Sequence, residues 1–268
     1  MKVLIIGNSK RLDTLYENLR LKGFETEHIK SYENLPDKIG HDLLILPVPT
    51  HNRMGLLNIE NNKYMTADDL LEKVNSNALI IGCNYKNEKF NCIDINRRDD
   101  FAILNAVPTA EGAIHAAVSN CKFSLFESKI LITGFGRVAK ILADRLKGLK
   151  CDVTVAARSI TDISFCKALG FKTADINCIE KYINNFDIIF QTVPPLILTK
   201  QVLDTMSSKN TIIELSSGSA GTDFEYASKK GIKVIHAPAL PERIAPITAG
   251  NILTECVMSI ISEKMTLG

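Results

Sequence analysis

The stretch at residues 129–159 constrains the possible folds more than any other part of the sequence. An apolar run at 130–132 predicts a buried strand, and the turn Gly134-Phe135-Gly136-Arg137-Val138-Ala139 follows it. Apolar residues at helical spacing then predict a helix, and a second apolar run at 153–156 predicts the next strand. This order of strand, G-x-G-x-x-A turn, helix and strand predicts a Rossmann dinucleotide-binding domain.

The small residues of this turn have separate physical roles. Gly134 permits the tight bend, Gly136 lets a pyrophosphate approach the backbone, and Ala139 lets the helix pack close to the strand. The free N–H groups in the first turn of the helix then face the phosphates. The predicted cofactor contacts are Gly134, Phe135, Gly136, Arg137 and Val138. The alternative is a glycine turn that holds no ligand.

The end of the second strand indicates which dinucleotide binds. A site for NAD usually places Asp or Glu there to bind the ribose 2′-hydroxyl. This chain has Ala156-Ala157-Arg158-Ser159 instead, without a carboxylate. Arg158 can pair with a 2′-phosphate and Ser159 can donate to it, so the cofactor predicted here is NADP. The alternative is that Arg158 is an ordinary solvated arginine.

Composition excludes several classes of protein. The 268 residues are 46% hydrophobic and 23% charged, which suits two modest globular domains. The net charge of +2 argues against a nucleic-acid or membrane partner. A strand at 2–6 follows Met1 without a signal-peptide pattern, and the seven cysteines contain no C-x-x-C. We expect a cytoplasmic protein with reduced thiols and no metal site.

The chain divides into two predicted α/β domains, both doubly wound. Residues 1–107 form a substrate or partner domain, because their first turn holds a single glycine and lacks the fingerprint. Residues 108–245 form the Rossmann domain, starting with a linking helix at 108–121 that begins at Pro108. Its six strands are predicted at 130–133, 153–156, 171–174, 187–191, 211–215 and 233–236. A last helix, about 248–264, is predicted to cross back onto the first domain, to which 246–268 then belong.

Other candidate site residues follow strand ends, because ligands of open α/β sheets bind beyond the carboxyl ends of the strands. Thr50 follows the third strand of the first domain and is a candidate substrate contact. In the second domain, Thr192, Val193 and Pro194 follow the fourth strand, and Ser216 follows the fifth. We expect these four residues to contact the cofactor; the alternative for the first three is a plain strand end.

Several motifs in order along the chain carry a resemblance to a known family. They are V-P-T-A-E-G at 107–112, G-F-G-R at 134–137, A-R-S at 157–159, G-T-D-F at 221–224 and A-P-I-T-A-G at 245–250. Together they resemble the A-subunit family of dipicolinate synthase, which belongs to dipicolinate biosynthesis during sporulation in endospore-forming bacteria. The chain departs from the family's pattern at Gly218-Ser219-Ala220 and at Glu242-Arg243.

The resemblance implies a reaction and a partner. A 4-hydroxy-tetrahydrodipicolinate, a cyclic imine with two carboxylates, would lose water and a hydride to give pyridine-2,6-dicarboxylate, with NADP as acceptor. The flavoprotein-like B subunit of the same synthase would be the partner, in a homo-oligomer or hetero-oligomer. The alternatives are another two-domain oxidoreductase, such as an alanine or 2-hydroxyacid dehydrogenase, and a non-catalytic NADP-binding scaffold.

This reaction assigns further candidate roles. Two carboxylates need a cationic clamp, which Arg98, Arg53 or Arg243 would supply, and Thr109 would add a hydrogen bond. Aromatisation also needs a proton acceptor. Glu111, expected in the first turn of the linking helix, is the first candidate for the base, and His115 lies one turn later on the same face. The alternatives are a helix-dipole carboxylate and a structural histidine.

Overall fold

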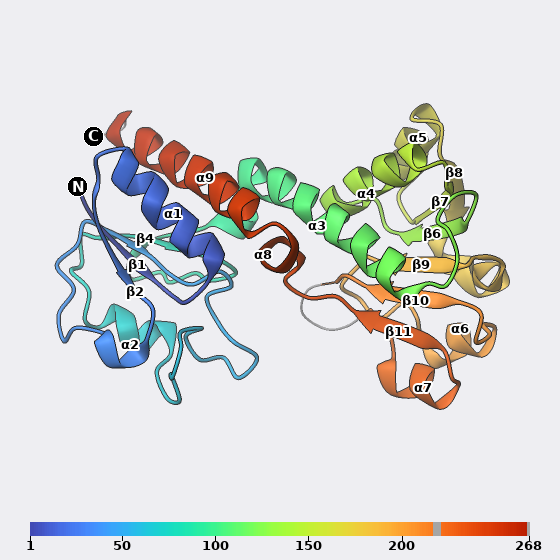
Figure 1. Cartoon of the computed structure of the whole chain (residues 1–268), viewed down its shortest axis with the longest axis horizontal. Coiled ribbons are helices and arrows are strands. Elements are labelled where there is room, and N and C mark those ends of the chain that lie inside the picture. Colours follow the sequence, from blue (N-terminus) through green and yellow to red (C-terminus); the bar gives the residue numbers. More distant parts are fainter. Residues whose placement is uncertain (217–220, 267–268) are drawn as a thin grey trace. The chain divides into compact units, whose positions relative to one another are not determined.

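The computed structural model describes residues 1–216 and 221–266. The chain forms two compact units, Met1–Asn105 together with Ala245–Gly268, and Ala106–Ile244. Each unit is built on its own parallel β-sheet, and each is described below by itself (Figure 1).

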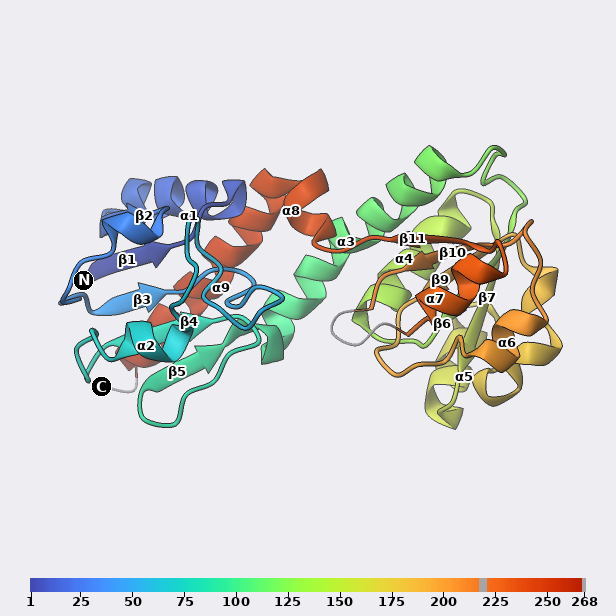
Figure 2. The same ribbon diagram turned by 90° about the horizontal axis from the view of Figure 1, so that it is seen from below.

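The first unit contains a five-stranded parallel sheet in the order β2-β1-β3-β4-β5 (Figure 2). The strands are β1 (Lys2–Ile6), β2 (Glu25–Ile29), β3 (Leu43–Ile45), β4 (Leu79–Gly82) and β5 (Asn91–Asp94). Helix α1 (Lys10–Leu21) contributes to the core on one face, and α2 (Ala67–Leu71) contributes to the core on the other. This strand order is that of the flavodoxin-like doubly wound sheets.

The last helix, α9 (Pro246–Thr266), packs against α1 in the first unit (Figure 1). The two helices approach closely because Gly250 has no side chain: a Cβ there would collide with Thr14. Asn18 of α1 also donates hydrogen bonds to Asn251, at 2.9 Å, and to Thr254, at 3.1 Å. The predicted return of the C-terminal helix to the first domain is confirmed.

The second unit contains six parallel strands in the order β11-β10-β9-β6-β7-β8. They are β6 (Lys129–Thr133), β7 (Asp152–Ala157), β8 (Lys172–Asp175), β9 (Ile188–Gln191), β10 (Thr211–Glu214) and β11 (Lys233–His236). Numbered within the unit, this is the 3-2-1-4-5-6 order of dinucleotide-binding sheets, with the reversal between β6 and β9. The predicted strand bounds agree with the structure to within one residue at every end.

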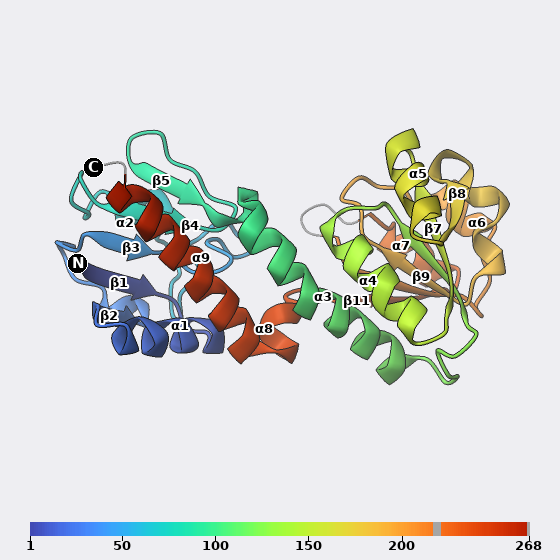
Figure 3. The ribbon, with the colours of Figure 1, turned by 90° about the horizontal axis from the view of Figure 1, so that it is seen from above.

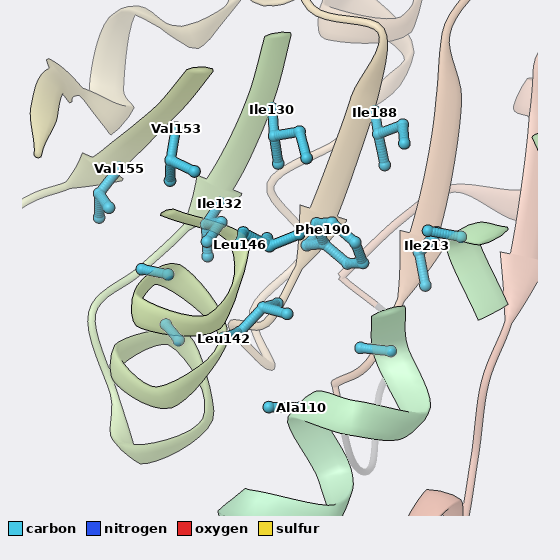
Figure 4. Close-up of a cluster of buried hydrophobic side chains, with 14 of the residues drawn as sticks. Ala110, Ile130, Ile132, Leu142, Leu146, Val153, Val155, Ile188, Phe190 and Ile213 are labelled. Carbon is cyan, nitrogen blue, oxygen red and sulfur yellow. The ribbon is translucent and has the colours of Figure 1, made fainter. Parts of the chain in front are cut away.

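Helices cover both faces of this sheet. One face packs against α4 (Arg137–Gly148) and the later part of α3 (Asp99–Asn120), through a cluster that includes Ile132, Phe190, Leu142 and Ala110 (Figure 4). The other face packs against α6 (Lys200–Asp204) and α7 (Phe224–Lys229). The remaining helices are α5 (Ile160–Ala168) and α8 (Leu240–Ile244). The four central strands β6, β7, β9 and β10 are mostly buried and rich in apolar residues, as expected for a parallel sheet covered on both faces, whereas the edge strands β8 and β11 are partly exposed.

The predicted start of the linking helix is wrong. Helix α3 begins at Asp99 and continues through Pro108, where the sequence predicted its first turn (Figure 3). Asp99 and Asp100 occupy the first turn, where carboxylates are favoured by the helix dipole. Pro108 removes one backbone hydrogen bond without ending the helix, because packing on both sides of it is retained: Ala106 and Ala110 are buried.

Helix α3 is also the one helix, among the described residues, whose length and composition would let it span a membrane. It carries core residues of the fold instead. Phe101 belongs to the core of the first unit, and Ala110, Ala113 and Ala117 belong to the core of the second. Burial therefore explains part of its apolar composition, while Ile103, Leu104 and Val118 on the same helix are exposed.

Candidate functional site

The turn after β6 lies where the strand order of the second unit reverses. Gly134 has φ +79°, and its N–H donates to the Ala156 carbonyl at 2.7 Å. A Cβ at Gly134 would lie 2.5 Å from Cγ1 of Val193, at the end of the neighbouring strand β9. Both the backbone conformation and the close contact therefore require glycine at this position.

Gly136 meets a different requirement. It is the N-cap of α4 with φ −76°, a value that any residue adopts. A Cβ there would meet nothing within 4 Å, so the position faces open space at the helix N-terminus. The first N–H groups of a helix have no partners within the helix, so a helix N-terminus beside open space suits a pyrophosphate, and this turn is suited to a dinucleotide.

The other residues of the turn are placed differently. Phe135 is 5% exposed and its ring belongs to the hydrophobic core, so only its backbone remains for the predicted cofactor contact. Arg137 is exposed and Val138 is half-buried, both in the first turn of α4. The predicted roles of Arg137 and Val138 as cofactor contacts stay predictions.

The end of β7 carries the two residues predicted to select NADP. Arg158 directly follows the strand and is exposed, and among the described residues it has no hydrogen bond or ion pair. Ser159 is the N-cap of α5, where its hydroxyl accepts from the N–H of Asp162 at 3.4 Å. The hydroxyl hydrogen of Ser159 remains available to donate. A cation, a donor and a helix N-terminus therefore lie together.

Beyond β9, Thr192 is tied to the fingerprint strand. Its N–H donates to Oγ1 of Thr133 at 3.0 Å, and its own hydroxyl donates to the Thr133 carbonyl at 2.5 Å. Val193 is half-buried and packs against the Gly134 position, and Pro194 is exposed. The structure thus brings the predicted residues Gly134, Thr192 and Val193 into one contiguous group.

Two buried polar residues beneath this group were not identified from the sequence. Thr133 and Gln191 end the neighbouring strands β6 and β9, and both are 0% exposed. The hydroxyl of Thr133 donates to the side-chain oxygen of Gln191. A polar residue at the end of an otherwise apolar strand is the signal that could have identified them.

The end of β10 adds a third buried polar residue. Glu214 is 1% exposed, and its Oε1 accepts from both the N–H and the hydroxyl of Ser216. The hydroxyl of Ser216 in turn accepts from the N–H of Gly221 at 3.2 Å. Ser216 is half-buried, and its predicted cofactor contact stays a prediction. The departure at Gly218-Ser219-Ala220 lies outside the described residues.

The candidate base Glu111 lies in the middle of α3, not in a helix start. Its exposed carboxylate is 3.3 Å from Nη2 of Arg145, which lies in the last turn of α4. The first turn of α4 belongs to the fingerprint, and Arg145 lies eight positions after Arg137, which is about 12 Å along the helix axis. His115 is exposed one turn further on and lies 3.5 Å from Ser119 Oγ. Thr109 is half-buried on the same helix.

Two of the candidate substrate-binding residues, Arg98 and Thr50, form hydrogen bonds to other residues of the first unit. Arg98 donates to both Asp100 and Glu263, and these carboxylates raise the pKa of its guanidinium above the ordinary value. Thr50 is 0% exposed, and its hydroxyl donates to the Pro47 carbonyl at 3.1 Å and accepts from the Cys83 N–H at 2.9 Å. These contacts favour structural roles for both side chains.

Arg243 differs from these two residues. It lies in α8 of the second unit, is exposed, and makes one long hydrogen bond of 3.5 Å to the Pro238 carbonyl. A single long bond leaves most of its five donors available to an anionic ligand. Its neighbour Glu242 is half-buried.

Comparison with known proteins identifies the second unit. Residues 107–221 match the family described as D-isomer specific 2-hydroxyacid dehydrogenase, NAD binding domain. The site is therefore that of a nicotinamide dinucleotide, in agreement with the geometry at Gly134 and Gly136. This match supports a dehydrogenase-like oxidoreductase.

Comparison over the whole chain gives relatives that are named as dipicolinate synthase A subunits. The A subunit of dipicolinate synthase from Bacillus subtilis (strain 168) is 31% identical over 232 residues, covering 83% of this chain and 78% of the relative. The solved structure of the same enzyme's A subunit from Bacillus halodurans has a TM-score of 0.88 at 26% identity, covering 97% of both chains. The Bacillus subtilis A chain has a TM-score of 0.87 at 26% identity, covering 100% of this chain and 98% of that one. On this evidence the chain belongs to the family of dipicolinate synthase A subunits.

Proposed function

We propose that the protein is an NADP-dependent dehydrogenase that forms pyridine-2,6-dicarboxylate. Its substrate would be a 4-hydroxy-tetrahydrodipicolinate, which loses water before oxidation. A hydride and a proton then leave neighbouring ring atoms, and the ring becomes aromatic. When bound, the nicotinamide ring of the cofactor accepts the hydride.

The observation that carries this proposal is the relationship to the dipicolinate synthase A subunit over most of both chains. The geometry of the second unit supports one part of the proposal, the binding of a nicotinamide dinucleotide. Gly136 offers open space, and the N-terminus of α4 offers the N–H groups of its first turn to a pyrophosphate. Both features belong to residues within the matched family region.

NADP, as opposed to NAD, is supported by the end of β7. The strand ends in Ala156 and Ala157, so the strand itself supplies no carboxylate to accept a ribose 2′-hydroxyl or to repel a 2′-phosphate. Arg158 is exposed and directly follows the strand, where a guanidinium can pair with a phosphate through two hydrogen bonds. Ser159 would add a donor from the N-cap position of α5.

The substrate's carboxylates need cationic partners, and Arg243 is the candidate in the second unit whose donors are least engaged. Arg98, Thr50 and Thr109 stay weaker candidates, since the first two already hold internal hydrogen bonds. Glu111 and His115 stay the candidates for the base. Of the two, Glu111 would have to leave its ion pair with Arg145 to act.

The proposal includes a partner. The relatives are named as the A subunits of an enzyme, which implies a second kind of chain in their assemblies. We propose the flavoprotein-like B subunit of dipicolinate synthase as the partner of this chain.

Ligand titration tests the proposal directly. The wild-type protein is titrated with NADPH and with NADH by nicotinamide fluorescence, and then with pyridine-2,6-dicarboxylate in the presence of NADP by calorimetry. NADPH should bind more tightly than NADH, and the dicarboxylate should bind to the NADP-loaded protein. Absence of binding of either dinucleotide would contradict the proposal.

A further inference from the structure

We propose that Gln191 is a positioning residue that holds three segments around the dinucleotide site in their binding arrangement. Its side chain is buried, so it would not touch the dinucleotide itself and would act through the segments that it holds. The proposal rests on the proposed binding of a nicotinamide dinucleotide to the second unit. It adds a residue that neither the fingerprint nor the family match identifies.

The oxygen of the Gln191 side chain holds the first two segments. It accepts the hydroxyl hydrogen of Thr133, the residue just before the fingerprint turn. It also accepts from the N–H of Val193 at 3.4 Å, in the segment that follows β9. Because Thr133 also accepts from Thr192 at 3.0 Å, the ends of β6 and β9 are linked by side chains as well as by the sheet.

The nitrogen of the same side chain holds the third segment. Nε2 donates to the Gly221 carbonyl at 3.0 Å. Gly221 lies so close that a Cβ added there would collide with the Gln191 amide, so the contact depends on glycine. The Gly221 carbonyl also accepts from the N–H groups of Ile197, at 3.0 Å, and Leu198, at 2.9 Å.

The N–H of Gly221 continues the network to the next strand. It donates to the hydroxyl of Ser216 at 3.2 Å, and Ser216 donates to the buried carboxylate of Glu214. Hydrogen bonds therefore connect the carboxyl ends of β6, β9 and β10, three adjacent strands. Gln191 is the member that joins the β6 side of this network to the Gly221 side.

An amide is needed at this position for a chemical reason. One atom must accept from Thr133 and Val193 while the other donates to Gly221, and Gln191 is 0% exposed, so water cannot replace a lost partner. A carboxylate would accept on both sides and face the Gly221 carbonyl without a hydrogen. A methionine would fill the space and make neither bond.

The test compares Gln191 with a buried amide at the other end of the same sheet. Asn210 is 0% exposed and lies just before β10. Its Oδ1 accepts from the N–H of Ser207 at 2.8 Å, and its Nδ2 donates to the carbonyl of Phe186 at 2.6 Å. Gln191→Glu and Asn210→Asp each exchange one buried amide for a carboxyl group of the same shape. Gln191→Met is a second variant, which introduces no charge and keeps the test valid if Gln191→Glu does not fold.

Two quantities are measured for each full-length variant: the melting temperature and the dissociation constant for NADPH, titrated well below the lowest melting temperature. Both exchanges should lower the melting temperature. Only the Gln191 variants should also lose affinity for NADPH, by about tenfold or more, because small displacements of binding groups have large effects. Wild-type affinity in the Gln191 variants, or an equal loss in Asn210→Asp, would overturn the proposal.

A pH series separates positioning from a general loss of stability. The carboxyl group introduced by Gln191→Glu can donate to the Gly221 carbonyl only when it is protonated, and burial favours that form. Glu214 is an ionisable side chain in the same network. Because the wild type carries it as well, the comparison with wild type separates its effect from that of the introduced carboxyl group. The affinity of Gln191→Glu for NADPH, relative to that of the wild type, should therefore recover as the pH is lowered from about 8 to about 5.5. A loss of affinity in Gln191→Glu that stays the same over this pH range would contradict the proposal, whereas failure of the wild type to bind either dinucleotide would instead refute the proposed function.

Discussion

Cγ1 of Val193 lies 2.5 Å from the point that a Cβ on Gly134 would occupy. The two residues follow the adjacent strands β6 and β9, so the fingerprint turn and the segment after β9 pack with no space between them. Gly134→Ala would introduce this collision at a φ of +79°. We expect a loss of about 1–3 kcal/mol in the free energy of unfolding, together with weaker dinucleotide binding.

Gly136→Ala is the matched control, because its Cβ would meet nothing within 4 Å and its φ is −76°. Chemical denaturation should give an unfolding free energy close to that of the wild type. The added methyl group would project into the space proposed for the pyrophosphate, so dinucleotide affinity should still fall. Unchanged affinity in Gly136→Ala would contradict this placement of the phosphates.

Arg158→Ala tests the choice of cofactor. Loss of a charge-assisted contact with the 2′-phosphate should weaken NADPH binding about tenfold and leave NADH binding nearly unchanged. Fluorescence titration of both cofactors measures this difference within one protein preparation. If both affinities fall equally, Arg158 does not discriminate between the cofactors.

Glu111→Gln decides between two roles for that carboxylate. The 3.3 Å ion pair with Arg145 and the position inside α3 favour a surface pair, which contributes little to stability when exposed. We therefore expect turnover within a few-fold of the wild type. A loss of roughly 10²–10⁴ in kcat, with unchanged cofactor binding, would establish Glu111 as the general base.

Arg98→Ala should change how stability depends on pH. Hydrogen bonds from Arg98 lower the pKa values of Asp100 and Glu263 below their ordinary values of 3.8 and 4.5. A carboxyl whose pKa is lowered by folding stabilises the fold above its unfolded pKa, and this contribution is lost as pH falls through the folded pKa. The variant should melt at a lower temperature than wild type at neutral pH, and the difference should shrink below about pH 4.

The neighbouring arginine provides the control for this series. Arg97 is far more exposed than Arg98, and its guanidinium lies 3.6 Å from Asp94. Arg97→Ala should have little effect on the melting temperature at any pH. A difference between Arg98→Ala and wild type that does not depend on pH would show that lost packing, not charge, explains the effect.

The centre of the sheet in the second unit could be predicted from the sequence because its central strands are buried on both faces. Continuous apolar runs such as Ile130–Ile132 leave a clear signal, and Gly134 and Gly136 mark the turn through requirements that are local in the chain. The return of α9 to the first unit was also predictable, since the six strands were already complete before it.

The start of α3 and the buried polar network were not predicted. Pro108 suggested a helix start, but the helix begins earlier, with acidic residues at 99 and 100, and packing carries it through the proline. Gln191 acquires its role from Thr133 and Gly221, which are distant in the sequence. Likewise, Arg98 meets Glu263 only after α9 has folded back onto the first unit. Such contacts depend on tertiary structure and leave no local pattern.

The most direct test of the proposed function is turnover. The wild-type protein, alone and together with the B subunit of the synthase, is incubated with NADP and 4-hydroxy-tetrahydrodipicolinate while the absorbance of reduced nicotinamide and of the pyridine product is followed. We predict equal amounts of NADPH and pyridine-2,6-dicarboxylate, and no reduction of NADP when the substrate is omitted. A protein that binds NADPH tightly but forms neither product, with or without the partner, would contradict the proposed reaction.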